Sequence, residues 1–520
     1  MKQQTFLKGA VILMAAGFLN RVLGFILKVV MVHYLGDEGV GLYQMVYPIY
    51  VTLILLSTCG FPVAVSKLVS QKNAKGDVRA VEKIRNISII FVLITSTIIA
   101  TTLIFSAKWI AVSVLSDIRT FYIILAIAPA LIFVSGASIL RSYFQGLKTM
   151  TPTALSQTIE QIVRLCASIL LLSILLNRGL KFGAAGAAVG ITMGEFAGMT
   201  TLVIILLIHR YFSKGDTLLA RDLSTAPSTA YSIKDTFKDL FKMGIPITVG
   251  RLVISLMYSL DAIIIPSQLQ NAGLTMAEAT SQFGQLSGIA MQIIFLPTTI
   301  SVALTTSLVP NISDALARNQ MQVIRNKYHE VLRITAYIGI PATLFFIYRG
   351  SDICHLLFNF PEAGSILSLL GTGAIAVYFI HVAGGVLNGL GKPHLAVKNM
   401  IIGAAFKVGG LLTLVSHPLF GIKGAAISMV LGWVAGAIAD FISIGRIIGF
   451  GFNVYHILIK PIVGTVLLYF LLPIFDSLGY TIGFSNKIVT LSTIFISVLF
   501  YFIWMILVRG ITKDDIEKFK

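Results

Sequence analysis

Two cations lie within the first long apolar stretch of the chain, residues 6–32, which is long enough to span a bilayer. Gly17, Arg21, Gly24 and Lys28 recur at the spacing i, i+4, i+7 and i+11, so all four share one face of a helix. A charge at the bilayer centre costs at least about 2.5–3.5 kcal/mol on insertion scales. We therefore expect this face to form one wall of a water-accessible, cationic cavity. The alternative is that both cations extend to the membrane surfaces.

A second polar stripe runs along residues 152–176. Its members recur at i, i+3, i+4, i+7 and i+11, again on one helix face, and are Gln157, Glu160, Gln161, Arg164 and Ser168. Glu160 precedes Arg164 by four residues, which is the favourable order for an ion pair on a helix. The pair is either a structural contact that neutralises itself or a cavity wall in which the glutamate holds the arginine in place.

The remaining in-span polar residues extend this pattern. Arg251 begins the second half of the chain much as Arg21 begins the first, and Glu195 is either a counter-ion to a cavity arginine or an ion-coupling site. Arginine presents a fork of donors that matches phosphate oxygens, so the excess of cations favours an anionic cargo. We predict substrate-binding cations at Arg21, Lys28, Arg164 and Arg251. We place a secondary set at Glu160, Asp261, Gln285, Gln292, Lys407 and Glu195.

Composition excludes several classes of protein. The 520 residues are 56% hydrophobic and only 12% charged, whereas an ordinary soluble domain is about 25% charged. The net charge of +18 resides mainly in short loops, which argues against nucleic-acid binding. The three cysteines are scattered and lack the spacing of a disulfide framework or a metal site. No Walker A loop or HExxH motif is present, so we predict neither an enzyme nor a cofactor or metal site.

Apolar runs of about 20 residues predict an all-α membrane protein with about fourteen spans. The runs cover residues 6–32, 41–66, 85–106, 121–145, 152–176, 183–209, 237–265, 279–309, 330–349, 364–389, 394–416, 421–446, 455–476 and 487–508. With the N-terminus in the cytoplasm, the termini and cytoplasmic loops hold 28 of the 40 Lys and Arg residues, and the external loops hold seven. This bias predicts a multi-pass protein of the cell membrane with both termini cytoplasmic.

The chain also repeats itself. Phe182-Gly-Ala-Ala-Gly-Ala-Ala-Val189 is echoed by Phe420-Gly-Ile-Lys-Gly-Ala-Ala-Ile427. Gln145-Gly-Leu147 is echoed by Asn388-Gly-Leu390, and a cation, Arg164 or Lys407, follows each glycine by eighteen residues. An even number of spans in each half gives a parallel repeat, as in many transporters. We predict a six-helix lobe over 1–210, a cytoplasmic linker over 211–234, a second six-helix lobe over 235–450, and two additional helices with a cytoplasmic tail over 451–520.

Several segments resemble the stage V sporulation protein B group, in the polysaccharide-transport branch of the multidrug/oligosaccharidyl-lipid/polysaccharide exporter superfamily. They are Gln4-Thr-Phe-Leu-Lys-Gly9, Asn20-Arg-Val-Leu-Gly-Phe25, Leu35-Gly-Asp-Glu-Gly-Val-Gly-Leu-Tyr-Gln44, Gly60-Phe-Pro-Val-Ala-Val-Ser-Lys67, Arg141-Ser-Tyr-Phe-Gln-Gly146 and Thr151-Pro-Thr-Ala-Leu-Ser-Gln-Thr-Ile-Glu-Gln-Ile-Val-Arg164. The resemblance implies two lobes around a central cavity, alternating access, and a cargo of undecaprenyl-pyrophosphate-linked saccharide, such as the lipid II-type precursor of spore cortex peptidoglycan. It also implies the membranes around the forespore of a sporulating cell.

The resemblance extends to site residues. Related lipid II flippases line their cavity with arginines of the first helix. Arg21 matches one of these positions, and Lys28 lies next to the second. Those flippases also use an arginine in span eight, where this chain has Gln285 and Gln292.

These observations together favour a flippase for a lipid-linked saccharide. An inside-negative potential would assist outward movement of an anion by about 2.3 kcal/mol per charge per 100 mV, and coupling to H+ or Na+ is an alternative energy source. One rival hypothesis is a cation-coupled multidrug exporter of the same superfamily. Another is a non-transporting membrane scaffold for sporulation cell-wall enzymes. The expected partners are the lipid-linked substrate, the bilayer and cell-wall synthesis enzymes, with the protein acting as a monomer.

Overall fold

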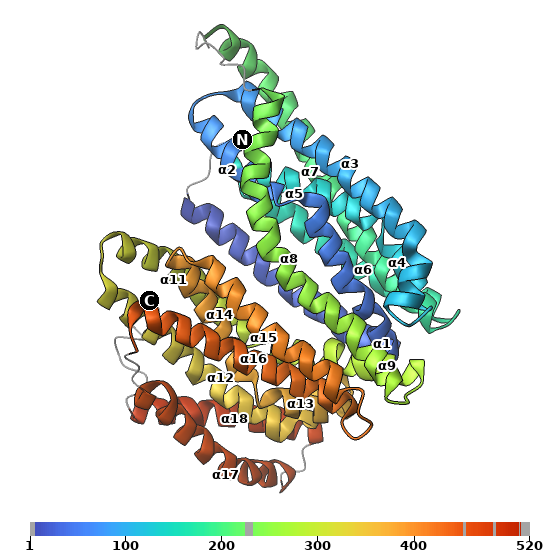
Figure 1. Cartoon of the computed structure of the whole chain (residues 1–520), viewed down its shortest axis with the longest axis vertical. Helices are drawn as coiled ribbons and strands as arrows, with labels where there is room; N and C mark the ends of the chain where they lie inside the picture. The colour runs from blue at the N-terminus through green and yellow to red at the C-terminus, as the bar shows by residue number, and fades with distance from the viewer. Residues whose placement is uncertain (1–5, 224–231, 451–453, 482–484, 509, 511–520) are drawn as a thin grey trace. The chain divides into compact units, whose positions relative to one another are not determined.

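The protein is described by a computed structural model that covers residues 6–223, 232–450, 454–481, 485–508 and 510. Every regular element within these residues is a helix (Figure 1). Helices are expected here because a segment inside a bilayer must satisfy its own backbone hydrogen bonds. The chain forms two compact units, Met1–Ile263 and Ile264–Lys520.

Twelve of the described helices are long and apolar enough to cross a membrane, and the bent pair Pro361–Gly371 and Ala374–Gly389 adds a thirteenth. The first of them, Val11–Ala74, includes residues 11–32 of the first predicted span and all of the second, because α1 (Phe6–Thr58) continues through a kink at Gly36. Gly36 has φ 65° and ψ −170°, a conformation open to glycine and costly for other residues. The prediction of an all-α polytopic membrane protein is confirmed.

The first unit continues with α2 (Phe61–Ala74), α3 (Val78–Trp109), the π-helix η1 (Ile110–Val114), α4 (Thr120–Ile127), α5 (Ala130–Gly146), α6 (Thr151–Leu176) and α7 (Leu180–Leu223). It also includes α8 (Ile233–Asn271) as far as Ile263. The predicted span 121–145 is divided into α4 and α5 at Pro129, which has no N–H to continue the ladder. The helix α7 extends to Leu223, into the predicted linker, of which residues 224–231 lie outside the described residues.

Helices α6 and α7 lie side by side (Figure 1). A row of glycines on α7, at every fourth residue from Gly186 to Gly198, faces α6. A Cβ at Gly186 would lie 2.7 Å from the Leu171 carbonyl oxygen, and one at Gly194 would lie 2.8 Å from the Arg164 Cβ. Only glycine permits so close an approach, and this approach brings the polar stripe of α6 against α7.

The second unit contains α9 (Met276–Phe283), the π-helix η2 (Gly284–Ala290), α10 (Met291–Ile294), α11 (Thr298–Ala317), α12 (Met321–Phe358), the 3-10 helix η3 (Pro361–Ala363), α13 (Gly364–Gly371), α14 (Ala374–Gly389), α15 (Pro393–Leu414) and α16 (Gly421–Ile448). The π-helix η4 (Tyr455–Ile459), α17 (Lys460–Thr481) and α18 (Asn486–Leu507) follow. The predicted span 279–309 is therefore interrupted, first by the π-helical turns of η2 and then at Pro297.

The last two helices are fastened to α12 by buried polar contacts. Arg349, at a non-helical position in α12, pairs with Asp476 of α17. The second carboxylate oxygen of Asp476 accepts a hydrogen bond of 2.8 Å from the Thr493 hydroxyl of α18. The Tyr337 ring packs with Leu468, Tyr501 and Met505. The additional helix pair is thus part of the second unit.

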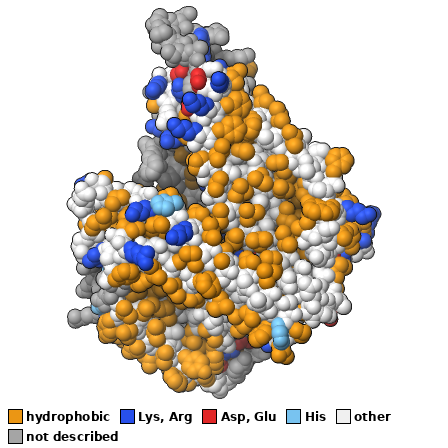
Figure 2. All heavy atoms as spheres, in the orientation of Figure 1, with side chains coloured by type: hydrophobic (Ala, Val, Ile, Leu, Met, Phe, Trp, Pro, Cys, Tyr) orange, Lys and Arg blue, Asp and Glu red, His pale blue; other side chains and the backbone are white. Residues whose placement is uncertain are grey.

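Large apolar side chains cover much of the surface, as Figure 2 shows on one face. Phe105 of α3, Phe470 of α17 and Leu507 of α18 are 85%, 67% and 73% exposed. Apolar exposure on this scale is incompatible with an aqueous surface and is typical of contact with lipid. The tertiary structure therefore agrees with the hydropathy pattern of the sequence.

Candidate functional site

Four charged side chains from three helices of the first unit form one network. Glu160 of α6 bridges two arginines: its Oε1 accepts a 2.6 Å hydrogen bond from Arg164 Nη2, and its Oε2 pairs with Nη2 of Arg141 on α5. Arg164 Nη2 also donates to Glu195 Oε1 of α7 at 2.6 Å. Arg141 Nε in turn donates to the Ser156 hydroxyl at 3.2 Å. The network therefore ties α5, α6 and α7 together.

The network is largely buried, and its formal charges balance. The side chains of Glu160 and Glu195 are 11% and 6% exposed, and those of Arg141 and Arg164 are 14% and 18% exposed. Two cations face two carboxylates, which is the condition under which charges remain ionised away from water. Glu195 Oε2 and Arg164 Nε are buried and have no hydrogen-bond partner among the described residues. Arg164 is thus an arginine whose charge is already compensated by its neighbours.

The local sequence accounts for this arrangement. Glu160 and Arg164 are one helical turn apart, so they meet on one face of α6, as the spacing predicts. On α7, Gly198 leaves the room that the network needs. A Cβ at this position would lie 3.1 Å from Glu160 Oε2 and 3.2 Å from Arg141 Nη2. Glycine at this position allows the carboxylate and the guanidinium to meet beneath α7.

The cationic face of α1 borders the polar stripe of α6. A Cβ at Gly24 would lie 3.5 Å from Gln161 Nε2. Gln161 Oε1 accepts a 3.4 Å hydrogen bond from Arg164 Nη1. Arg21 and Lys28, which share the face of Gly24, are exposed and partly buried respectively. The two polar faces that the sequence singles out separately are therefore neighbours within the first unit.

The other predicted site residues lie elsewhere. Arg251 is exposed on α8, and Asp261 is buried on the same helix. In the second unit, Gln285 lies in η2, and Gln292 of α10 donates to the Ser287 carbonyl at 3.1 Å. Lys407 is partly buried on α15, with its Cβ 2.7 Å from the position of a Cβ at Gly432.

The sequence pattern predicts no site role for Arg141. The structure places it within α5, paired with Glu160. One signal was available, because the predicted span ends at residue 145 and Arg141 lies a full turn before that end. The partner could not be found in this way, since Glu160 is nineteen residues further along, on another helix.

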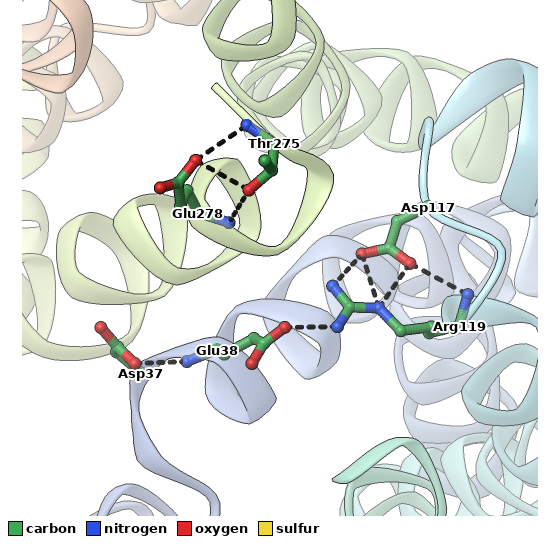
Figure 3. Close-up of polar contacts among 6 residues, drawn as sticks. All are labelled: Asp37, Glu38, Asp117, Arg119, Thr275 and Glu278. Atoms are coloured by element: carbon green, nitrogen blue, oxygen red, sulfur yellow. Dashed lines mark hydrogen bonds and ion pairs between the residues drawn. The ribbon is translucent and has the colours of Figure 1, made fainter. Parts of the chain in front are cut away.

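A second charged cluster lies where α1 turns at Gly36 (Figure 3). Arg119 donates through Nε and Nη2 to the two carboxylate oxygens of the fully buried Asp117, at 3.0 and 2.7 Å. Its Nη1 donates to Glu38 of α1. These hydrogen bonds, that to Asp117 foremost, raise the pKa of Arg119 above its ordinary value. The cluster fastens α1 to the turn between η1 and α4.

Figure 3 also shows a capping box at the start of α9 in the second unit. The Thr275 hydroxyl accepts from the Glu278 N–H at 3.3 Å, and Glu278 Oε2 accepts from the Thr275 N–H at 2.9 Å. The hydrogen bonds from the Thr275 hydroxyl and N–H lower the pKa of Glu278. This box is a helix start and supplies no substrate contact. Among the described residues, no group of three His, Cys, Asp or Glu side chains is placed to hold a metal ion.

The fold and this site define a class: a polytopic, all-helical membrane protein with a buried, balanced ionic network beside a cationic helix. Residues 6–316 match the model of the family described as "Polysaccharide biosynthesis protein". The chain is 30% identical over 519 residues to stage V sporulation protein B of Bacillus subtilis (strain 168), covering 100% of this chain and 98% of that protein. The protein therefore belongs to the polysaccharide biosynthesis protein family and, within it, to the stage V sporulation protein B group, as its motifs predict.

Two further relatives extend this picture. The lipid II flippase MurJ of Bacillus subtilis (strain 168) is 28% identical over 477 residues, covering 87% of this chain and 84% of that protein. A solved structure described as "Lipid II flippase MurJ, inward closed conformation" superposes with a TM-score of 0.71 at 15% identity, over 96% of this chain and 99% of the other. The structural likeness shows a shared fold.

Proposed function

We propose that this protein is a flippase that moves a saccharide linked to a lipid pyrophosphate from one membrane leaflet to the other. The family assignment supports a role in polysaccharide biosynthesis. The name of one relative, a lipid II flippase, supports lipid II or a similar lipid-linked precursor as the cargo. Such a protein translocates its cargo unchanged and performs no covalent chemistry on it.

The contact between α1 and α6 carries this proposal. Gly24 and Gln161 bring the α1 face that bears Arg21 and Lys28 against the polar stripe of α6. Arg164 is paired with two carboxylates, whereas Arg21 is exposed. In our proposal Arg21 and Lys28 bind the phosphate groups directly, and Arg164, held by its carboxylates, orients the adjoining wall through Gln161.

The remaining predicted residues are assigned by chemistry. Arg251 supplies a further cation for the pyrophosphate, and Lys407 and Asp261 contribute to the polar surface that the head group crosses. Gln285 and Gln292 offer amide groups that suit the hydroxyl and amide groups of a sugar–peptide head group. The lipid tail remains in the bilayer during the movement.

We propose the membrane potential as the main energy source, because outward movement of an anion is favoured by an inside-negative potential. Coupling to H+ or Na+ is the alternative, and Glu195 is the candidate residue, since its buried Oε2 has no hydrogen-bond partner among the described residues. We place both termini in the cytoplasm. The proposed location is the membranes around a forespore. The proposed flippase acts there as a monomer, beside cell-wall synthesis enzymes.

Translocation of labelled lipid II in proteoliposomes tests the proposal. The Arg21→Ala variant is expected to lose most of the movement, while Arg178→Ala, an exposed arginine between α6 and α7, is the matched control and is expected to retain it. Full activity of Arg21→Ala would overturn the binding role of the α1 cations. A wild-type protein that inserts normally but moves no lipid II would overturn this cargo and direct the test to other undecaprenyl-linked glycans, or to drug efflux.

A further inference from the structure

We infer that Arg141 is a positioning residue for the anionic cargo: it balances the charge of Glu160 and so keeps the polar wall beside α1 neutral. The inference rests on the proposed function, because it concerns the affinity for an anion. It adds a residue of α5 that lies outside every group of predicted site residues, and it assigns that residue a measurable role in cargo binding.

The first step is the geometry of Glu160. Each of its two carboxylate oxygens serves a different arginine, Oε1 for Arg164 and Oε2 for Arg141. Arg164 is at the same time shared with Glu195. With Arg141 present, two cations face two carboxylates. Without the Arg141 charge, two carboxylates face Arg164 alone, and with both carboxylates ionised the network carries a net charge of minus one.

The second step is the position of the network. Arg164 contacts Gln161 through its Nη1, and Gln161 faces Gly24 on the cationic side of α1. An excess negative charge would therefore arise next to the surface that bears Arg21 and Lys28. Because the network side chains are largely buried, solvent screens this charge poorly. The charge would repel an anion bound at α1 and would weaken the pull of the α1 cations.

The third step is the internal repeat, in which the corresponding helix crossing of the second half packs closely without such a network. The pair α15 and α16 packs as α6 and α7 do: a Cβ at Gly432 would lie 2.7 Å from the Lys407 Cβ, as one at Gly194 would lie 2.8 Å from the Arg164 Cβ. In the sequence register of the repeat, the four network residues correspond to Gly384, Gly403, Lys407 and Trp433. Helices α15 and α16 of the second half thus pack with the same close contact, although none of these positions carries a carboxylate.

The inference predicts that net charge, rather than the identity of any one side chain, sets the affinity for the anion. Arg141→Gln makes the network negative and is expected to raise the half-saturating concentration on the order of tenfold. Arg141→Gln combined with Glu160→Gln is neutral again and is expected to bring the value back near that of the wild type. Arg141→Lys keeps the charge and is expected to behave like the wild type.

Two measurements on the full chain test this. Binding of undecaprenyl pyrophosphate to the protein in lipid nanodiscs reports affinity for the anion, and translocation of labelled lipid II in proteoliposomes reports transport. Arg85→Gln is the control for lost burial of an arginine, since Arg85 is fully buried in the same unit, 5.0 Å from the Tyr143 ring centroid and outside the network. It is expected to lower the unfolding temperature while leaving the half-saturating concentration unchanged.

The outcomes separate the inference from the proposed function. Recovery of binding in the neutral double variant, even with a lowered unfolding temperature, supports the inference. Unchanged binding by Arg141→Gln overturns it, as does a double variant that binds as weakly as Arg141→Gln, because the role of Arg141 is then structural. Should Arg141→Gln fail to fold, binding by the double variant and by Arg141→Lys still tests the inference, because weak binding by either variant would overturn it. Charge-dependent binding of undecaprenyl pyrophosphate without lipid II movement overturns the proposed cargo and leaves the inference standing, whereas a wild type that binds no undecaprenyl pyrophosphate overturns both.

Discussion

Arg164 of α6 donates to Glu195 of α7 at 2.6 Å, beside one of the close glycine contacts between the two helices. The residue before Glu195 is Gly194, at which a Cβ would lie 2.8 Å from the Arg164 Cβ. The ion pair and the glycine contact are therefore two parts of one crossing. The glycine sets the distance between the helices, and the carboxylate compensates the charge that this distance buries.

Substitution of Gly194 should disrupt this crossing. A valine would overlap the Arg164 Cβ and the Glu160 carbonyl, so Gly194→Val is expected to lower the unfolding free energy by about 1–3 kcal/mol through overpacking. Thermal unfolding in detergent measures the effect. Gly409→Ala on α15 is the control, because a Cβ there meets nothing within 4 Å. Equal stability of the two variants would contradict the packing argument.

Removal of the Glu195 carboxylate should leave Arg164 only partly compensated. Glu195→Ala is expected to cost roughly 3–5 kcal/mol of stability, because a buried cation loses one of its partners. Combining it with Arg164→Ala in a double-mutant cycle isolates the coupling between the two side chains. Strict additivity of the two single changes would show that the pair contributes nothing.

Transport should respond to the membrane potential. If the cargo crosses with its phosphate charges, an imposed inside-negative potential of 100 mV favours outward movement by about 2.3 kcal/mol per charge. Lipid II translocation in proteoliposomes, with a potassium diffusion potential of either sign, measures this. Translocation rates that do not change with the potential but increase with a proton or sodium gradient would instead favour ion coupling. The Glu195→Gln variant would then be expected to lose its dependence on the ion gradient.

The Arg119 cluster should stabilise the first unit over the whole physiological pH range. The pKa of Arg119 is raised, so its contribution is present below the ordinary pKa of an arginine and is lost only as the pH rises through the higher folded value. Arg119→Ala removes the guanidinium that pairs with the buried Asp117 carboxylate and is expected to cost roughly 3–5 kcal/mol between pH 6 and 9. Lys108→Ala, an exposed cation of α3, is the control for thermal unfolding, and an equal loss there would contradict this assignment.

The start of α9 should loosen in acid. Because the pKa of Glu278 is lowered, its contribution is present above the ordinary value of 4.5 and is lost as the pH falls through the lower folded value. Protection against hydrogen exchange at the first turn of α9, corrected for the intrinsic exchange rate at each pH, is expected to fall below pH 4.5 in the wild type. In Glu278→Gln the same amides are expected to exchange with little dependence on this titration. An identical pH profile in both proteins would rule out the capping role.

Local sequence patterns were sufficient to predict the membrane spans and the members of each polar face. Twenty apolar residues form a spanning helix because the bilayer leaves no other partner for the backbone, and a charge in such a run requires compensation wherever the helix packs. The i, i+4 spacing likewise placed Glu160 beside Arg164. The breaks at Pro129 and Pro297, by contrast, divide what hydropathy alone describes as single spans.

Tertiary structure decided the charge of the site. Whether Arg164 is a free cation or a compensated one depends on Glu195, thirty-one residues away on α7, and on the second arginine that Glu160 binds, nineteen residues earlier on α5. Hydropathy and helical spacing describe one helix at a time. Electrostatic compensation depends on which helices lie side by side, and here that is set by the glycines of α7, which allow two helices to approach until their charges meet.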